Sequence, residues 1–522
     1  MRRLPLRKRM ALRPLTSRLI PVFCPTLGNQ GRILMTSNQE TSASASTSQS
    51  ALGISNRQRW SIVGLLFSAS MLNYIDRATI SYALPLISED LHLDPTGKGV
   101  LLSAFFWSYA FMQIPIGWAA DRVNLKWLYA GMFTLWSLAC GLAGTAGSLG
   151  VLIVLRVLLG FGESIYLPGG MTVVSRLFPP KERGLPSGMF DFGTRSGLVL
   201  DGILLPWLIV TYGWRNMFYI VGFTALIWLL PWLLTFPSRL PAHQGGAAQP
   251  DPRKAPLESA AVLAFPIILL IAPILVPLQI RYPNALGGPN RPGPIGAIHR
   301  FLILLRNRNL YGIVLGFFCF DYYWYMMLNW LPDYLKTARG LAIREYGIYA
   351  AITFFIFGVT EPLGGWLADR LIRRGWDETR TRKGIVTVGF LTGLAVIPAT
   401  LMESHGTVTL VQSIPWLYDK PVQIPIHVIL VFGAAFVGLS TGNLLAILQC
   451  CAPPDQVGIW TGVKNYSGNL GGIIGPLVMG FLISRTDSYA PGFTVGAILL
   501  VLGLIPYWFI VGELRPRGGT PS

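Results

Sequence analysis

The chain has 522 residues, of which 52% are hydrophobic and 13% charged, and its formal net charge is +18. Soluble domains carry about 25% charged residues, so this composition excludes an ordinary water-soluble enzyme. A basic balance also occurs in nucleic-acid-binding proteins. Here, however, Lys and Arg lie mostly in the N-terminal tail and between apolar stretches, as in membrane proteins. We expect a lipid bilayer as partner and no nucleic acid.

Residues 1–59 form a basic tail that is first Arg-rich and then Ser-rich, with no acidic residue before Glu40. Disordered cytoplasmic tails and organellar transit peptides share this composition. We favour the tail, and an organellar membrane stays the alternative.

The cysteines show no metal-ligand spacing, and their odd number argues against a disulfide framework, so we interpret them as small buried apolar residues. We expect no metal ion and no cofactor. They are Cys24, Cys140, Cys319, Cys450 and Cys451.

From Trp60 onward, apolar segments of about 20 residues recur, which is the length that crosses a bilayer core. The connections alternate between basic loops, such as 122–126 and 370–383, and loops that lean acidic, such as 89–94 and 403–419. This alternation places both termini in the cytoplasm, with the mildly basic external connection 336–344 as an exception. We predict twelve membrane-spanning helices, at residues 60–83, 99–120, 127–147, 149–176, 184–212, 214–236, 310–331, 346–368, 384–402, 423–447, 458–483 and 493–511.

A hexapeptide recurs at the end of the second and eighth predicted helices, as Gly117-Trp118-Ala119-Ala120-Asp121-Arg122 and Gly365-Trp366-Leu367-Ala368-Asp369-Arg370. A repeat at equivalent positions predicts two six-helix halves, 60–236 and 310–511, related as a parallel repeat. Residues 237–309 then form a cytoplasmic linker, whose apolar, Pro-interrupted part 260–280 we place at the membrane interface. Residues 512–522 are a second cytoplasmic tail.

The first copy of this hexapeptide resembles the loop signature of the major facilitator superfamily. The resemblance implies a gating role for Gly117, Asp121 and Arg122, and for Asp369 and Arg370 in the second copy. The plainer alternative is that the glycine allows close helix packing and that the charges anchor a loop at the interface.

Four further motifs resemble the anion:cation symporter family, which includes bacterial aldonate and hexuronate carriers and animal vesicular glutamate and sialic acid carriers. The resemblance implies an all-α membrane protein of twelve helices in the cell (inner) membrane. It also implies proton-coupled symport of a small organic anion, such as a sugar acid, by alternating access. We expect a monomer. The motifs are residues 73–77, 160–163, 330–335 and 468–473.

Ionisable side chains inside the predicted helices mark candidate site residues, because each costs about 2.5–3.5 kcal/mol at a helix centre. A guanidinium matches the geometry of a carboxylate and stays charged, so Arg77 is the first candidate to bind the anion and Arg156 the second. Three pairs at helical spacing complete the predicted binding set, namely Tyr74 with Arg77, Tyr109 with Gln113, and Asn465 with Asn469. The two asparagines are predicted to contact hydroxyl groups of a polyol acid, with the alternative that they only bridge helices.

Two acidic residues, Asp76 and Glu163, are the proton-coupling candidates, and the resemblance to aldonate carriers points to the same positions. Low dielectric favours the protonated carboxyl, whereas a nearby Arg favours the ionised form. Glu163 lies two turns from Arg156 on one helix face, so we expect these two to pair in the empty carrier. Alternatively, Arg77 and Arg156 are structural ion-pair partners of Asp76 and Glu163.

Six further charged residues of the predicted helices receive no role from the sequence. Arg195 is either a third anion contact or a partner of Asp191, one turn away. The six are Asp191, Arg195, Asp201, Asp321, Glu361 and Lys464.

The chain has no His-Glu-x-x-His, Gly-x-Ser-x-Gly or P-loop motif, which argues against an enzyme. A non-transporting sensor, a drug exporter and a neutral-solute carrier remain alternatives, and the last two are disfavoured because neither substrate needs paired guanidinium groups. The sequence leaves open which anion is carried and whether protons or sodium ions drive it.

Overall fold

The computed structural model describes residues 54–179, 182–238, 240, 281, 307–401, 407–411, 422–453 and 457–514. Arg57 and the residues after it belong to one compact unit. The expected N-terminal tail up to residue 53 and most of the expected linker lie outside the described residues.

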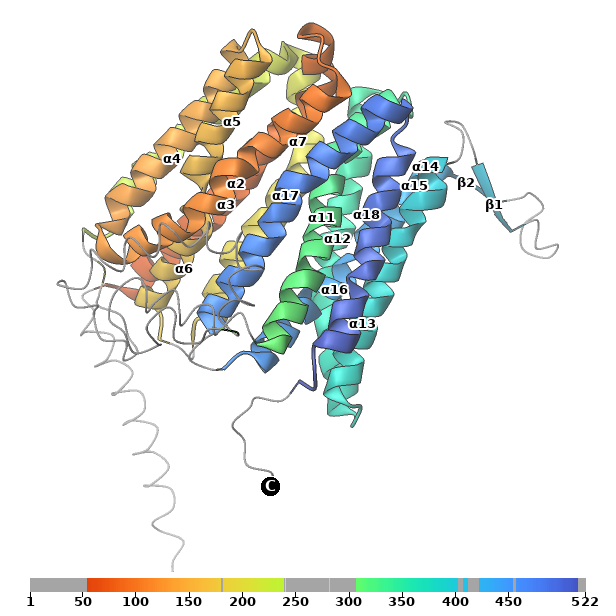
Figure 1. Ribbon diagram of the computed structural model, residues 1–522. Coiled ribbons are helices and arrows are strands. Elements are labelled where there is room, and N and C mark those ends of the chain that lie inside the picture. The colour runs from red at the N-terminus through yellow and green to blue at the C-terminus, as the bar shows by residue number, and fades with distance from the viewer. Residues whose placement is uncertain are drawn as a thin grey trace, which may run out of the picture. The chain divides into compact units, whose positions relative to one another are not determined.

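The predicted helices are confirmed, although several consist of two consecutive pieces. In Figure 1 they run side by side in two groups, from α2 to α8 and from α11 to α18. The first group is α2 (Asn56–Asp90), α3 (Pro95–Arg122), α4 (Leu125–Leu142), α5 (Leu149–Glu163), α6 (Tyr166–Leu177), α7 (Gly184–Ala225) and α8 (Leu229–Thr235). The second is α11 (Arg308–Thr337), α12 (Ile343–Arg373), α13 (Glu378–Thr392), α14 (Val396–Leu401), α15 (Ile426–Phe436), α16 (Gly438–Cys451), α17 (Val457–Thr486) and α18 (Ala490–Leu502), followed by a π turn at Pro506–Ile510.

Eight helical segments of the described residues are long and apolar enough to cross a membrane. One of them, Gly184–Thr235, has 52 residues and turns at Gly213, whose φ of 82° favours glycine, so it holds two predicted spans. Helices α2, α3 and α11, with 35, 28 and 30 residues, are equally long but more polar. These three complete the set of twelve.

A short antiparallel hairpin interrupts the otherwise helical fold. It joins β1 (Thr407–Val411) to β2 (Val422–Pro425), with Thr407 opposite Pro425. The β-branched residues of both segments favour strands. The sequence analysis placed part of this hairpin in an external connection and did not predict strands there.

The two groups of helices contact each other through α3 with α17 and α7 with α12. Glycines make both contacts close: a Cβ atom on Gly202 would lie 2.4 Å from the carbonyl oxygen of Gly347, and one on Gly99 would lie 2.5 Å from that of Pro476. Both contacts lie toward the end at which α3 and α12 begin, which we call the closed end.

A buried ion pair also joins the two groups at the closed end. Lys98 at the start of α3 approaches Asp333 near the end of α11, with 3.0 Å between Nζ and Oδ1. The hydroxyl of Tyr489 donates to the other oxygen of Asp333 at 2.7 Å. Because Asp333 is fully buried, these two partners compensate for its removal from water.

Gly202→Val is expected to destabilise the protein, because its side chain would overlap the backbone of α12. Overpacking of a close contact costs about 1–3 kcal/mol. The matched control is Gly131→Val in α4, since no neighbouring atom lies within 4 Å of a Cβ added there. Thermal unfolding in detergent should show a lower melting temperature for Gly202→Val than for the control. Equal melting temperatures would contradict the close contact.

Candidate functional site

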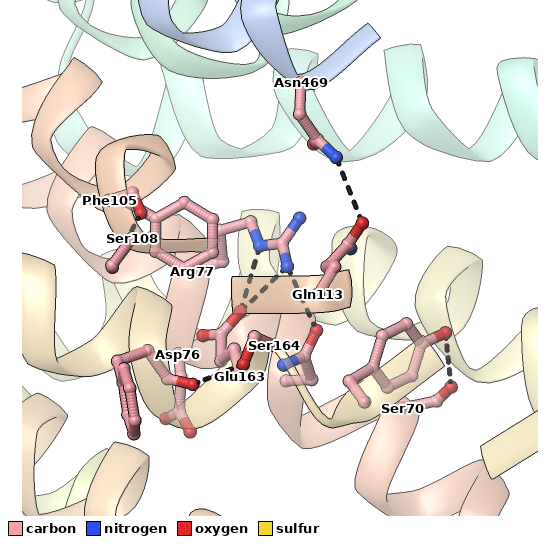
Figure 2. A network of polar contacts seen from close by, with 12 residues as sticks. Ser70, Asp76, Arg77, Phe105, Ser108, Gln113, Glu163, Ser164 and Asn469 are labelled. Atoms are coloured by element: carbon pink, nitrogen blue, oxygen red, sulfur yellow. Dashed lines mark hydrogen bonds and ion pairs between the residues drawn. The ribbon is translucent and has the colours of Figure 1, made fainter. Parts of the chain in front are cut away.

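Arg77 and Glu163 form a buried ion pair between α2 and α5. The Arg77 Nη2 lies 2.8 Å from the Glu163 Oε2, and Nε donates to the same oxygen at 3.2 Å. Asn73, one turn earlier in α2, accepts a longer bond of 3.4 Å from Nη2. Figure 2 shows this arrangement, with Gln113 and Asn469 beyond the guanidinium. The ion pair fixes the orientation of the Arg77 guanidinium inside the helix bundle.

Three aromatic rings surround the Arg77 guanidinium. Its Cζ atom lies 4.9 Å from the ring centre of Tyr74, 4.5 Å from that of Phe105 and 4.6 Å from that of Tyr109. The negative faces of such rings attract a cation. Tyr74 and Arg77 therefore lie on the same face of α2, and Tyr109 from α3 contacts the same guanidinium.

Glycine in α5 brings the ring of Phe105 to this position. A Cβ atom on Gly160 would lie 2.1 Å from the Phe105 carbonyl oxygen, so α3 and α5 touch along their backbones. On the other side, a Cβ on Gly162 would lie 2.8 Å from Trp136 in α4. Each of these two glycines therefore allows the close approach of a different neighbouring helix.

Glu163 lies at a break in the fourth predicted helix, between α5 and α6. Pro168 has no N–H group to donate to the carbonyl of Ser164, so the regular pattern of helical bonds cannot continue there. Ser164 instead donates its backbone N–H to Phe161 at 3.2 Å. The predicted span 149–176 is confirmed as Leu149–Leu177, with a short turn interrupting its helix directly after the candidate proton site.

Arg156 does not pair with Glu163, contrary to the expectation for the empty carrier. Seven residues separate them, which is about 10 Å along a helix axis, whereas Arg77 reaches Glu163 from the adjacent helix. The Arg156 guanidinium is buried, and none of its three nitrogens has a hydrogen-bond partner among the described residues. It lies over the Phe105 ring, 5.2 Å from its centre. The alternative pairing of Arg77 with Asp76 is also wrong.

Asp76 is fully buried and faces Cys140 and Trp136 of α4. Neither of its carboxylate oxygens has a hydrogen-bond partner within the described part of the chain. Leaving a buried polar group without a hydrogen-bond partner is costly. Asp76 lies beside the Arg77–Glu163 pair and not in it, and its proton-coupling role stays a prediction.

Amide side chains from both groups of helices meet next to Arg77. Gln113 in α3 accepts hydrogen bonds from Asn465 at 2.9 Å and from Asn469 at 3.4 Å, both in α17. The hydroxyl of Tyr325 in α11 donates to Asn469 at 3.2 Å. The structure therefore brings the three predicted amides together, and we call Gln113, Asn465, Asn469 and Tyr325 the amide cluster.

A second set of charges lies between α7 and the helices α11, α12 and α17. Arg195 pairs with Glu361 at 2.8 Å between Nη2 and Oε2, so its predicted alternative partner Asp191 is not the one it bonds. Lys464 lies 3.7 Å from the ring centre of Phe317. The carboxylate of Asp321 lies against Gly468, one turn from Lys464, where an added Cβ would be 1.8 Å from Oδ2.

The two copies of the hexapeptide make different contacts. Gly117 packs on Pro168, because a Cβ atom added to this glycine would lie 3.3 Å from the Cβ of the proline. The side chains of Asp121 and Arg122 lie outside the described part of the chain. In the second copy, Asp369 accepts a hydrogen bond of 3.0 Å from Arg382 in α13. Arg370 lies over the ring of Trp366, 5.2 Å from its centre.

Sequence reasoning missed three residues of the site. Asn73 precedes Arg77 by four residues and Phe105 precedes Tyr109 by four, so helical spacing was the available signal for both. Tyr325 belongs to an aromatic stretch in α11 that gave no indication of which ring faces the site. No group of three or more His, Cys, Asp or Glu side chains suited to a metal ion occurs within the described residues.

Residues 66–418 match the Major Facilitator Superfamily. The chain is 28% identical over 464 residues to the probable galactarate/D-glucarate transporter GarP of Escherichia coli strain K12, covering 88% of this chain and 95% of the relative. It is 31% identical over 485 residues to the probable galactarate/D-glucarate transporter GudP of Pseudomonas putida, covering 88% and 92%. The probable L-galactonate transporter of E. coli K12 is 26% identical over 455 residues, covering 86% and 88%.

Solved structures share the fold at lower identity. A bacterial homologue of the human lysosomal transporter Spinster, in an inward-facing and occupied conformation, superimposes with a TM-score of 0.63 at 18% identity, covering 87% of this chain and 97% of the other. A D-xylose-proton symporter gives 0.59 at 15% identity, covering 88% and 99%. These findings confirm the predicted resemblance and exclude an enzyme family. The chain belongs to the major facilitator superfamily, as a membrane transporter whose relatives are named as sugar-acid carriers.

Proposed function

We propose that this transporter carries a sugar acid together with protons, using the Arg77–Glu163 pair as its central element. The observation that carries the proposal is this buried pair, whose guanidinium lies among aromatic rings and next to the amide cluster. A carboxylate and a guanidinium form paired, charge-assisted hydrogen bonds. The relatives named as galactarate, D-glucarate and L-galactonate transporters support the same substrate class.

In this proposal, the substrate carboxylate competes with Glu163 for Arg77. A displaced Glu163 would be a buried, unpaired carboxylate, which is costly, whereas the protonated acid costs much less. Glu163 therefore takes up a proton when substrate binds and releases it when the substrate leaves. Asp76, whose oxygens lack partners among the described residues, is the second proton-coupling residue.

Arg156 supplies the second positive charge of the proposed site. Its guanidinium has no hydrogen-bond partner to lose among the described residues, so it can attract the anion without breaking an existing bond. The Phe105 ring lies beside both Arg77 and Arg156 and keeps the two cations in one compartment. A neutral solute would gain nothing from two guanidinium groups, which argues against a neutral-solute carrier.

The amide cluster suits the hydroxyl groups of a sugar acid. Amide groups both donate and accept hydrogen bonds, as do hydroxyls. Because Gln113 belongs to one half and Asn465 and Asn469 to the other, a bound polyol chain would contact both halves. Such contacts, with Tyr74 and Tyr109 on the first half, link substrate binding to the relative position of the halves.

We place both termini in the cytoplasm of a cell-membrane protein that acts as a monomer, so the closed end faces outward. Alternating access then requires the Lys98–Asp333 pair to break and the opposite end to close. Gly117, Asp121 and Arg122, with Asp369 and Arg370 in the second copy, lie at that opposite end, and we assign them to its gate.

Arg77→Lys is expected to weaken binding of galactarate or galactonate about tenfold or more, and Arg77→Ala about a hundredfold, because hydrogen bonds to charged groups contribute about 1.5–3 kcal/mol. Lysine keeps the positive charge but lacks the planar guanidinium that can donate two parallel hydrogen bonds to one carboxylate. Calorimetry of purified protein in detergent measures the affinities. Unchanged affinity in both variants would remove Arg77 from the site.

Glu163→Gln should uncouple transport from the proton gradient while leaving the site intact, since glutamine imitates the neutral acid in size. Counterflow of labelled substrate between equal pools should persist in proteoliposomes, and accumulation under an inward proton gradient should disappear. The control is Glu378→Gln, which removes a half-exposed partner of Arg382 far along the chain in α13. If Glu163→Gln accumulates substrate normally, the proton is carried elsewhere, with Asp76 the next candidate.

The same assay separates a transporter from a non-transporting sensor. The unmodified protein should accumulate labelled sugar acid in proteoliposomes under an inward proton gradient, and an inward sodium gradient at equal pH should not replace it. Ligand binding in detergent without any accumulation would favour the sensor.

A further inference from the structure

We propose that Arg195 anchors a second carboxylate, so that the site selects sugar acids with a carboxylate at both ends over those with one. This inference rests on the proposed function. Arg77 would hold the first carboxylate, the amide cluster the hydroxyl groups between, and Arg195 the far end. The substrate class is then the six-carbon dicarboxylates, of which galactarate is an example.

The Arg195–Glu361 pair is accessible in a way that the Arg77–Glu163 pair is not. Its side chains are 18% and 22% exposed, against 4% and 0%. The buried Nε of Arg195 has no hydrogen-bond partner among the described residues. The partly exposed Arg195 guanidinium can be reached by a ligand without first separating the halves of a fully buried pair, which fits a ligand-binding group better than a purely structural partner.

The surroundings of Arg195 repeat those of Arg77. Its Cζ atom lies 5.8 Å from the ring centre of Trp324 and 5.4 Å from that of Phe357. The rings attract the cation and limit its orientations, as three rings do for Arg77. Each guanidinium is therefore held by one glutamate and by aromatic rings.

Tyr74 connects the two cations. Its ring lies beside Arg77, and it also interacts electrostatically with Arg195. Helix α7 approaches α2 here, because a Cβ atom on Gly197 would lie 3.1 Å from the Cβ of Tyr74. Arg195 therefore lies on the helix that packs against α2, and in this proposal Arg77 and Arg195 are within reach of a single small molecule.

Glu361 retains a second cation when a substrate takes Arg195 from it. Lys464 of α17 interacts electrostatically with Glu361, Asp321 and Asp191, and Asp191 and Lys464 are the other charged groups that act on Glu361. Lys464 offsets part of the cost of releasing Arg195, whereas the negative charge of Asp191 adds to that cost. A monocarboxylate leaves the Arg195–Glu361 pair in place.

The simpler interpretation is that Arg195 and Glu361 only join α7 to α12. Arg195→Gln distinguishes the two. In proteoliposomes, the concentration of unlabelled galactarate that halves uptake of labelled galactonate should rise about tenfold or more, as expected for loss of hydrogen bonds to a charged group. The corresponding value for unlabelled galactonate should change less than about twofold. Arg215→Gln is the control, because Arg215 forms a comparable 2.8 Å pair with Asp90 at the surface.

Equal weakening for both acids, or none for either, would overturn the proposal. Should Arg195→Gln fail to fold, Glu361→Gln provides the test, because it frees Arg195 and should hold or improve the affinity for galactarate. Loss of both acids in that variant would again favour a structural role. An unmodified protein that takes galactonate and excludes galactarate contradicts this inference alone, whereas one that takes neither contradicts the proposed function.

Discussion

The buried pair of Arg77 and Glu163 is the interaction on which the arrangement of the site depends. Two ions removed from water need each other and further hydrogen bonds, since neither is stable alone in low dielectric. This need explains why the neighbouring helices approach so closely: Gly160 brings α3 against α5, and Phe105 then covers the guanidinium. When Glu163 is neutralised, Arg77 keeps Asn73 and the three aromatic rings and becomes available to a replacement anion.

The close backbone contacts at the closed end follow a different logic. The two groups of helices meet there through backbone contacts, of Gly202 with Gly347 and of Gly99 with Pro476, without large side chains. The directional interactions are the ion pair and the hydrogen bond that Asp333 forms with Lys98 and Tyr489. A contact made of backbone and one ion pair has few side chains to reorder when it separates. The centre of the bundle is the opposite case, because amides and charges there make specific bonds that a ligand can replace.

Much of this molecule could be predicted from the sequence, because lipid imposes length and apolarity on every crossing. The twelve helices, the repeat and the superfamily followed from that constraint and from the hexapeptide motif. The selection of Arg77, Glu163, Gln113, Asn465 and Asn469 as candidate site residues also followed from intramembrane polarity and helical spacing, although their functional roles are still predictions.

What the sequence could not supply were contacts between helices. Spacing within one helix favoured Arg156 as the partner of Glu163. Arg77, on the adjacent helix, is closer to Glu163 and forms the pair. The link between Lys98 and Asp333 joins residues from different halves, so no local pattern could indicate it. The break after Glu163 had a local cause in Pro168, yet a proline in a membrane helix does not by itself tell whether the helix bends or breaks.

That break has a mechanical consequence. Helix α5 ends at Glu163 and α6 begins at Tyr166, and Pro168 in the first turn of α6 is also the residue against which Gly117 of the loop motif packs. A helix segment without continuous hydrogen bonds bends more easily than an intact one. Movement of Glu163 away from Arg77 can therefore be transmitted through this short, flexible segment to the start of the hexapeptide. The charge state of one carboxyl group and the position of the loop are then mechanically coupled.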